Sequence, residues 1–269
     1  LLDAKISVSY YTFALSIAQL ITSVVYSIIV VSIPRLSYYH GNSDEKNYTE
    51  LLNQVARTFL FLVIPMGIGL SCVSDEVMLI YAGEKYLEAG FILKLFSLRI
   101  VMWALDQLLA NQVLFVRGYE KNITAFYFIG GFLNLILNIV LLKLKVVQAE
   151  YFVYTTLFSE IVVLIIQIYF ITKRNIISIN EILKSYVKYI LCAVPFFAIT
   201  YGINHTLNYS LNLNLQFFVR VLAIIVSCVL YYFIIMLITK DKILFVTLDG
   251  IKNKFRVIKY KLKSKKYKG

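Results

Sequence analysis

Ionisable and amide side chains gather in one long apolar stretch of this sequence, residues 91–116. Such groups are costly inside a lipid bilayer, so they usually face other helices or a water-filled path. Arg99 and Asp106 are nearly two helical turns apart, which predicts one shared helix face, and Ala110 and Arg117 continue that face. The pattern predicts either a hydrated path that binds anionic or sugar groups, or a structural ion pair between Arg99 and a carboxylate. The polar residues of this stretch are Lys94, Arg99, Asp106, Gln107, Asn111 and Gln112.

Two later stretches carry a smaller set of polar groups. Asn134 and Asn138 are four residues apart, so they lie on one helix face and can hydrogen-bond a neighbouring helix. We therefore expect them to serve helix packing. Glu160 has Thr156 and Gln167 on roughly its own face. Because a carboxyl group removed from water can hold its proton, Glu160 is a candidate ion-coupling group, or equally a neutral acid bonded across helices.

The elements that position these residues are predicted to be membrane-spanning helices. The chain is 60% hydrophobic and only 16% charged, and its mean hydropathy is +0.76. About 20 helical residues cross a hydrocarbon core of about 30 Å, and the continuous apolar runs do not alternate as barrel strands would. We therefore expect an all-α polytopic membrane bundle of about seven transmembrane helices. The seven runs are 10–33, 55–74, 91–116, 123–142, 151–172, 187–203 and 216–239.

The distribution of Lys and Arg predicts an orientation. Twenty of the 27 basic residues fall in one alternate set of loops and in the C-terminal tail, whereas four fall in the opposite set. Because positively charged loops stay in the cytoplasm, we expect the N-terminus outside and the C-terminus inside. Arg220, near the outer end of the last run, is expected to snorkel to the surface. The predicted division is an external stub at 1–9, four spans within 10–142, three further spans within 143–239, and a cytoplasmic polybasic tail at 240–269.

The sequence offers little that indicates catalysis. The three cysteines, Cys72, Cys192 and Cys228, have no metal or redox spacing. Glycine loops for phosphate, nucleophile elbows and clustered metal ligands are not found in the sequence either, so we expect no catalytic residue, cofactor or metal, and not an enzyme. The basic tail is expected on the lipid surface, with a partner-binding role as the alternative, and not on nucleic acid. Pro65, with Gly67 and Gly69, is expected to kink the second span.

Short motifs follow one another at fixed places relative to the predicted spans. They are Tyr10-Tyr11-Thr12-Phe13-Ala14, Pro34-Arg35-Leu36-Ser37, Pro65-Met66-Gly67-Ile68-Gly69, Tyr81-Ala82-Gly83-Glu84-Lys85-Tyr86, Arg117-Gly118-Tyr119-Glu120-Lys121 and Asn134-Leu135-Ile136-Leu137-Asn138. In the order and spacing of these motifs, residues 3–160 resemble the C-terminal half of a bacterial polysaccharide-unit flippase, which moves O-antigen or capsule repeat units and belongs to the multidrug/oligosaccharidyl-lipid/polysaccharide exporter superfamily. The sequence departs from this family at Gln148-Ala149-Glu150-Tyr151, where a Gly-Ala-x-Gly type turn is usual.

The resemblance implies a transport mechanism. Members of that family have two helix bundles around a central cavity, so the chain would be one half of a two-bundle transporter that lacks its N-terminal half. The implied reaction is translocation of polyprenyl-pyrophosphate-linked oligosaccharide repeat units across the cytoplasmic membrane. Arg99 and Arg117 would bind the anionic headgroup, because guanidinium groups pair well with phosphate. Asp106, Asn111 and Gln112 would contact sugar hydroxyls, and Glu160 would couple an ion.

The same resemblance implies the partners, and two other functions remain open. The partners would be the lipid-linked oligosaccharide, membrane lipids, the missing N-terminal half, and polysaccharide polymerase and assembly proteins. One alternative is a drug/cation antiporter of the same superfamily, although Lys94 and Arg99 outnumber Asp106 in the third span. The other is a membrane polysaccharide polymerase, although the external loops are short for chemistry.

Overall fold

The computed structural model describes residues 2–207 and 209–245, with side chains from residue 6 onward. The described residues form helices and connecting turns, without strands. They divide into two units, residues 1–228 and 229–269, which we treat separately. The elements, in chain order, are α1 (Leu2–Gly41), α2 (Glu45–Cys72), α3 (Ser74–Ala82), a 3₁₀ turn η1 (Glu84–Tyr86), α4 (Ala89–Gln107), a π-helical segment η2 (Leu108–Phe115), α5 (Glu120–Lys143), α6 (Ala149–Lys173), α7 (Asn180–Ala193), α8 (Phe196–Thr206) and α9 (Leu215–Ile238).

Six helical segments among the described residues are long and apolar enough to cross a membrane. The seventh predicted run, 91–116, forms α4 and η2 in succession. The expectation of a polytopic, all-α membrane bundle is therefore confirmed. The residues predicted as an external stub are already helical, since α1 begins at Leu2.

The first two long helices form a hairpin whose turn is stabilised by a side-chain cap. Asp44 precedes α2, and its Oδ1 accepts a hydrogen bond from the Asn47 backbone N–H at 3.1 Å. The helix then continues through Pro65 as one element, without a break between Glu45 and Cys72. Gly67 brings α2 close to α4, because a Cβ at this position would lie 2.9 Å from the Ser97 carbonyl oxygen.

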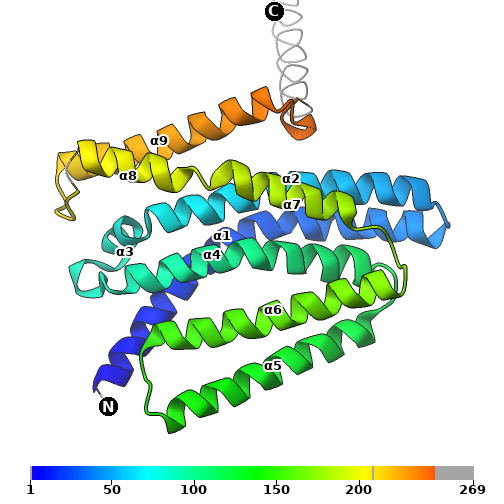
Figure 1. The fold of residues 1–269 in the computed structure, drawn as a ribbon, viewed down its shortest axis with the longest axis horizontal. Coiled ribbons are helices and arrows are strands. Elements are labelled where there is room, and N and C mark those ends of the chain that lie inside the picture. Colours follow the sequence, from blue (N-terminus) through cyan, green and yellow to red (C-terminus); the bar gives the residue numbers. More distant parts are fainter. Residues whose placement is uncertain (1, 208, 246–269) are drawn as a thin grey trace, which may run out of the picture. The chain divides into compact units, whose positions relative to one another are not determined.

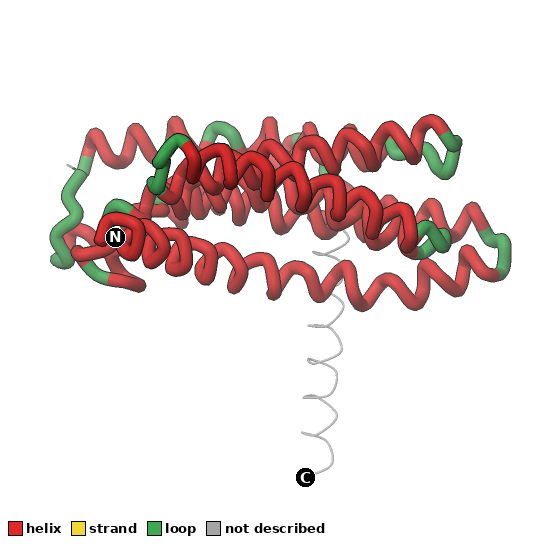
Figure 2. The backbone as a smooth tube through the Cα atoms, turned by 90° about the horizontal axis from the view of Figure 1, so that it is seen from below, coloured by secondary structure: helices red, strands yellow, loops and turns green. Residues whose placement is uncertain are grey.

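The helix that carries Arg99 and Asp106 lies at the centre of the first unit. α4 packs against α1, α2, α3 and α6. Figure 1 shows α4 between α2 and α6, and Figure 2 shows the described residues as helices joined by loops. Its neighbours therefore shield it from lipid. By contrast, α5 packs mainly against α6 and exposes large apolar side chains such as Phe128 and Phe132. This is the distribution expected of a bundle whose outer helices face hydrocarbon.

The sixth predicted run is divided into two helices. α7 ends at Ala193 and α8 begins at Phe196, with Val194 and Pro195 between them. Proline has no backbone N–H and its ring clashes with the preceding turn, so the helix breaks there. A continuous run over 187–203 was expected, and Pro195 divides it into two helices. In the second unit, α9 ends at Ile238, and the tail predicted at 240–269 lies largely outside the described residues.

Candidate functional site

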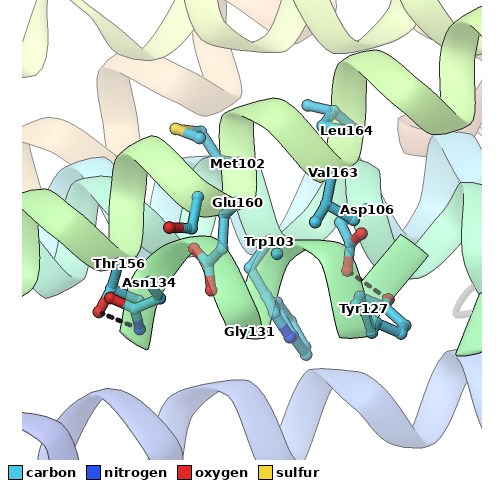
Figure 3. A pocket seen from close by; sticks show the side chains of 12 residues that line it. Met102, Trp103, Asp106, Tyr127, Gly131, Asn134, Thr156, Glu160, Val163 and Leu164 are labelled. Atoms are coloured by element: carbon cyan, nitrogen blue, oxygen red, sulfur yellow. Dashed lines mark hydrogen bonds between the residues drawn. The ribbon is translucent and has the colours of Figure 1, made fainter. Parts of the chain in front are cut away.

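A cavity of about 200 Å³ lies between α4, α5 and α6 (Figure 3). Trp103 and Met102 of α4 contribute an apolar wall, and Gly131 leaves open space on the α5 side. The cavity is therefore partly apolar in its surface but contains several polar groups from all three helices. Those polar groups are Asp106, Tyr127, Asn134, Thr156, Ser159 and Glu160.

An ion pair joins α4 to α6 at one edge of this cavity. The Arg99 Nε donates a hydrogen bond to Glu160 Oε2 at 2.8 Å, and Arg99 Nη2 donates to Glu160 Oε1. The two side chains are 24% and 32% exposed, and Glu160 lines the cavity. The structural ion pair considered from the sequence is present, and it brings together the predicted headgroup-binding residue and the predicted ion-coupling residue.

The second carboxylate in the cavity, Asp106, accepts its hydrogen bonds from neutral groups. Asp106 Oδ2 accepts hydrogen bonds from the Tyr127 hydroxyl at 2.8 Å and from Gln107 Nε2 at 3.0 Å. Asp106 Oδ1 accepts from Gln167 Nε2 at 2.9 Å. None of the ion pairs found among the described residues includes Asp106. Three neutral donors bond to it directly, and Arg99, which is paired with Glu160, acts on it through longer-range electrostatics.

The two asparagines on α5 contact the facing helix α6. Asn138 Oδ1 accepts a hydrogen bond from the Thr155 hydroxyl at 2.6 Å, and Asn134 lies 3.5 Å from the Thr156 hydroxyl. Gly130 permits this approach, since a Cβ there would clash with Val163 Cγ2. These contacts hold the α5 side of the cavity in place.

The other predicted site residues lie elsewhere. Asn111 donates to the side chain of Gln107 in the preceding turn at 2.9 Å. Gln112 is fully buried and donates to the Ser32 hydroxyl on α1 at 2.5 Å. Arg117 pairs with Glu45 at the start of α2, so it is not part of the cavity.

The π-helical segment explains why Arg99 and Arg117, which were predicted to share one helix face, point toward different helices. Arg99 and Arg117 are eighteen residues apart, which is five turns of an uninterrupted α-helix. η2 lies between them, and its i→i+5 turns take more residues than α turns, so the helix phase changes. The Tyr48 hydroxyl donates to the Gln112 carbonyl oxygen within η2 at 2.7 Å. Arg99 therefore faces α6, whereas Arg117 faces the α1–α2 hairpin.

Two important residues were missed or misread in the sequence. Arg220 was expected to snorkel, but its side chain is 1% exposed and pairs with Glu76 of α3 at 3.1 Å. The Tyr209 ring lies 4.5 Å from its guanidinium group. The expectation for Arg220 is therefore wrong. Tyr127 was not singled out, although it lies seven residues before Asn134 and could have been placed on the same face of α5.

The class of protein can now be stated. A bundle of membrane-spanning helices with a polar cavity among them is the architecture of a multi-pass membrane transporter. Among the described residues, no group of three His, Cys, Asp or Glu side chains could hold a metal ion.

The particular family follows from comparison. Residues 4–222 match the family described as lipid II flippase MurJ, and the chain belongs to this family. Flippases are transporters rather than enzymes. The resemblance read from the sequence is therefore correct at the level of a lipid-linked-precursor flippase family, although the matching family is named for lipid II and not for polysaccharide units.

One solved structure has a similar fold. It is described as "Lipid II flippase MurJ, inward closed conformation", and it matches with a TM-score of 0.64 at 19% sequence identity. The match covers 86% of this chain and 47% of that one, so this chain spans about half the length of the solved protein. Among curated protein sequences, none matches the chain.

Proposed function

We propose that this chain is the C-terminal half of a flippase that moves a lipid-linked saccharide precursor across the bacterial cytoplasmic membrane. Its membership of the lipid II flippase family over residues 4–222 is the observation that carries this proposal. The biased distribution of Lys and Arg supports an external N-terminus and a cytoplasmic C-terminus for these residues. The other half of the transporter and the surrounding lipids would be the immediate partners.

The substrate would be a saccharide carried on a polyprenyl pyrophosphate. The family description favours the peptidoglycan precursor lipid II. The ordered motifs between residues 10 and 138 favour a second candidate, the oligosaccharide repeat unit of a capsule or O-antigen, with polysaccharide polymerase and assembly proteins as further partners. Both substrates present a pyrophosphate and sugar hydroxyls, so the same protein groups would serve either one.

Arg99 is the residue that we assign to the anionic headgroup. Its guanidinium group is partly exposed and already holds a carboxylate through two hydrogen bonds. A pyrophosphate oxygen offers the same paired geometry with more charge, so it would compete with Glu160 for Arg99. Glu160 would then occupy Arg99 when no substrate is bound. It would leave Arg99 when the headgroup binds, and pair with Arg99 again when the headgroup leaves.

The remaining predicted substrate residues receive different roles. Asn111 and Gln112 bond to other helical residues, and we assign them to packing around η2. Arg117 holds the start of α2 through Glu45. Asp106 lies in the cavity but has three donors of its own, so we do not assign it to sugar hydroxyls.

The test is the leaflet distribution of lipid-linked sugars in cells that depend on the gene encoding this chain. Deletion of the gene should trap the precursor in the inner leaflet. Arg99→Ala should reproduce this defect, and Arg99→Lys should restore part of the transport because it keeps the charge but not the paired hydrogen bonds.

Arg57→Ala is the matched control, because Arg57 forms an ion pair with Glu181 away from the cavity. It should leave transport unchanged. The chemical identity of the trapped lipid separates lipid II from a capsule or O-antigen unit. If the deletion traps no lipid-linked sugar, the proposed function is wrong.

A further inference from the structure

The two carboxylates of the cavity have opposite surroundings. We propose that Asp106 is a proton-binding site that takes up and releases a proton during transport, while Glu160 keeps its charge. This inference rests on the proposed function, because it names the ion that would be coupled to flipping and the side chain that would carry it. It also places the coupling role on Asp106 and not on Glu160, the residue for which the sequence predicted it.

Glu160 is poorly suited to gain a proton. Both of its oxygens accept hydrogen bonds from the guanidinium group of Arg99. Arginine stays charged and can only donate hydrogen bonds, so a protonated Glu160 would face a fixed donor and lose its ion pair. The pair as a whole is neutral, which suits a bilayer interior.

Asp106 has no such fixed partner. From its own helix it faces Gln107, with Arg99 nearly two turns away and committed to Glu160. From α5 it faces Tyr127, and from α6 it faces Gln167, with Glu160 as the neighbouring like charge. A lone negative charge within a membrane bundle is costly, and one proton removes that cost.

The groups around Asp106 can serve it in both protonation states. A tyrosine hydroxyl can donate or accept by turning its hydrogen, and a glutamine amide can do the same by rotating through half a turn. The Gln167 Oε1 atom is buried and has no hydrogen-bond partner. When Asp106 is ionised, Tyr127 and Gln167 donate to it. When Asp106 is protonated, its own O–H can donate to the Tyr127 oxygen or to the rotated Oε1 of Gln167.

The adjoining cavity supplies a route for the proton. Asp106 lines the space of about 200 Å³ between α4, α5 and α6, which is roomy enough for several water molecules. The proton would arrive from water in this space, bind one carboxylate oxygen of Asp106, and leave by the same route. No other bond is made or broken. Uptake removes one negative charge from the bundle interior and leaves the Arg99–Glu160 pair unchanged.

Infrared difference spectroscopy on the purified full chain in lipid tests this inference without requiring transport. The wild-type chain, titrated from alkaline to acidic pH, should develop the carbonyl stretch of a protonated carboxylic acid inside the protein, and this band should shift in heavy water. Asp106→Asn, which is nearly isosteric, should abolish the band. The double variant Arg99→Gln/Glu160→Gln, which removes the ion pair as a unit, should keep it.

Two controls make the outcome decisive. Asp75→Asn changes a carboxylate of α3 that does not line this cavity, and it should leave the band intact. Unfolding curves of each variant check that the fold is retained. A band that persists in Asp106→Asn and disappears in the double variant would overturn the inference in favour of Glu160, and a wild-type chain without the band would overturn it outright. Loss of the band with normal transport would contradict coupling while leaving the proposed flippase activity in place.

Discussion

Two arginine–carboxylate pairs in this chain have the same chemistry and different surroundings. Arg220 and Glu76 are 1% and 4% exposed, whereas Arg99 and Glu160 are 24% and 32% exposed. The Ser210 carbonyl oxygen also accepts a hydrogen bond from Arg220, at 2.9 Å. The Arg220 pair is buried by its neighbours, and it joins α9 to α3 as a structural ion pair. The Arg99 pair is partly exposed and its Glu160 member lines the cavity, so we expect Arg99 to exchange its partner more readily than Arg220.

The aromatic and acidic groups around Arg220 agree with a sealed site. Burial raises the pKa of Tyr209 to about 12, so its hydroxyl keeps its proton at neutral pH. Burial also raises the pKa of Glu76, while the positive charge of Arg220 works in the opposite direction. Removing either charge would leave the other uncompensated.

The largest effect is therefore expected at the sealed pair. Arg220→Met should destabilise the chain by about 3–5 kcal/mol, because it leaves the Glu76 carboxylate buried without a partner. The measurement is thermal or denaturant unfolding of the purified chain in detergent. The double variant Arg220→Met/Glu76→Leu should recover much of the loss. A single variant as stable as the wild type would show that the pair is not sealed in solution.

A smaller effect is expected at the cavity pair. Arg99→Ala should destabilise the same chain by about 1.5–3 kcal/mol, since it removes hydrogen bonds to a charged group that solvent can partly replace. Unfolding measured beside Arg220→Met gives the comparison directly. If the two variants lose equal free energy of unfolding, the distinction between a buried structural pair and an exchangeable pair is wrong.

Glycines extend the comparison from charge to packing. A Cβ on Gly67 would lie 2.9 Å from the Ser97 carbonyl oxygen, which is backbone and cannot move aside cheaply. Gly67→Ala should therefore cost about 1–3 kcal/mol. Gly131 borders the cavity and has nothing within 4 Å of its added Cβ, so Gly131→Ala is the matched control. It should be neutral or stabilise the helix by up to about 1 kcal/mol in the same unfolding assay.

The smallest effect is expected at an exposed charge outside both pairs. Hydrogen bonds from the side chain and backbone of Asn47 hold the pKa of Asp44 below its usual value. The stabilisation from this helix cap is present above the pKa of unfolded Asp44 and is lost as pH falls through the lower, folded value. Asp44→Asn keeps the cap and should remove this part of the pH dependence. Unfolding curves recorded from neutral to acidic pH measure it, and identical pH profiles would contradict the assignment.

Composition and apolar run length predicted most of the fold. The bundle, its class and six of its spans follow from the cost of exposing backbone and charge to lipid. Helix phase predicted one shared face for Arg99 and Asp106, and both contact α6, through Glu160 and Gln167, because α4 is regular as far as Gln107. The same reasoning failed for Arg117, because the π-helical segment comes between it and Arg99. Nothing in the local sequence marks that segment, since its geometry depends on contacts with α1 and α2 such as the one from Tyr48.

Ion pairs between residues far apart in the sequence could not be predicted either. Glu160 and Arg99 were each identified as costly in lipid, and pairing was considered for Arg99 alone. The Glu76–Arg220 pair was missed because Glu76 follows a span and looks like an ordinary surface acid. In the structure Glu76 is 3% exposed, and the loop that holds Tyr209 and Ser210 contacts both the neighbouring Asp75 and Arg220. A long-range contact of this kind is not encoded in periodicity.

The sealed pair also has a consequence for biogenesis. Arg220 belongs to α9, the most hydrophobic span of the chain, and an arginine raises the free energy of moving such a helix from the translocon into lipid. Glu76 is synthesised long before Arg220, so the acceptor for this charge is already in the membrane when α9 emerges from the ribosome. We therefore expect the insertion of α9 to depend on prior assembly of the helix that carries Glu76, because an error there would leave Arg220 without its counter-ion.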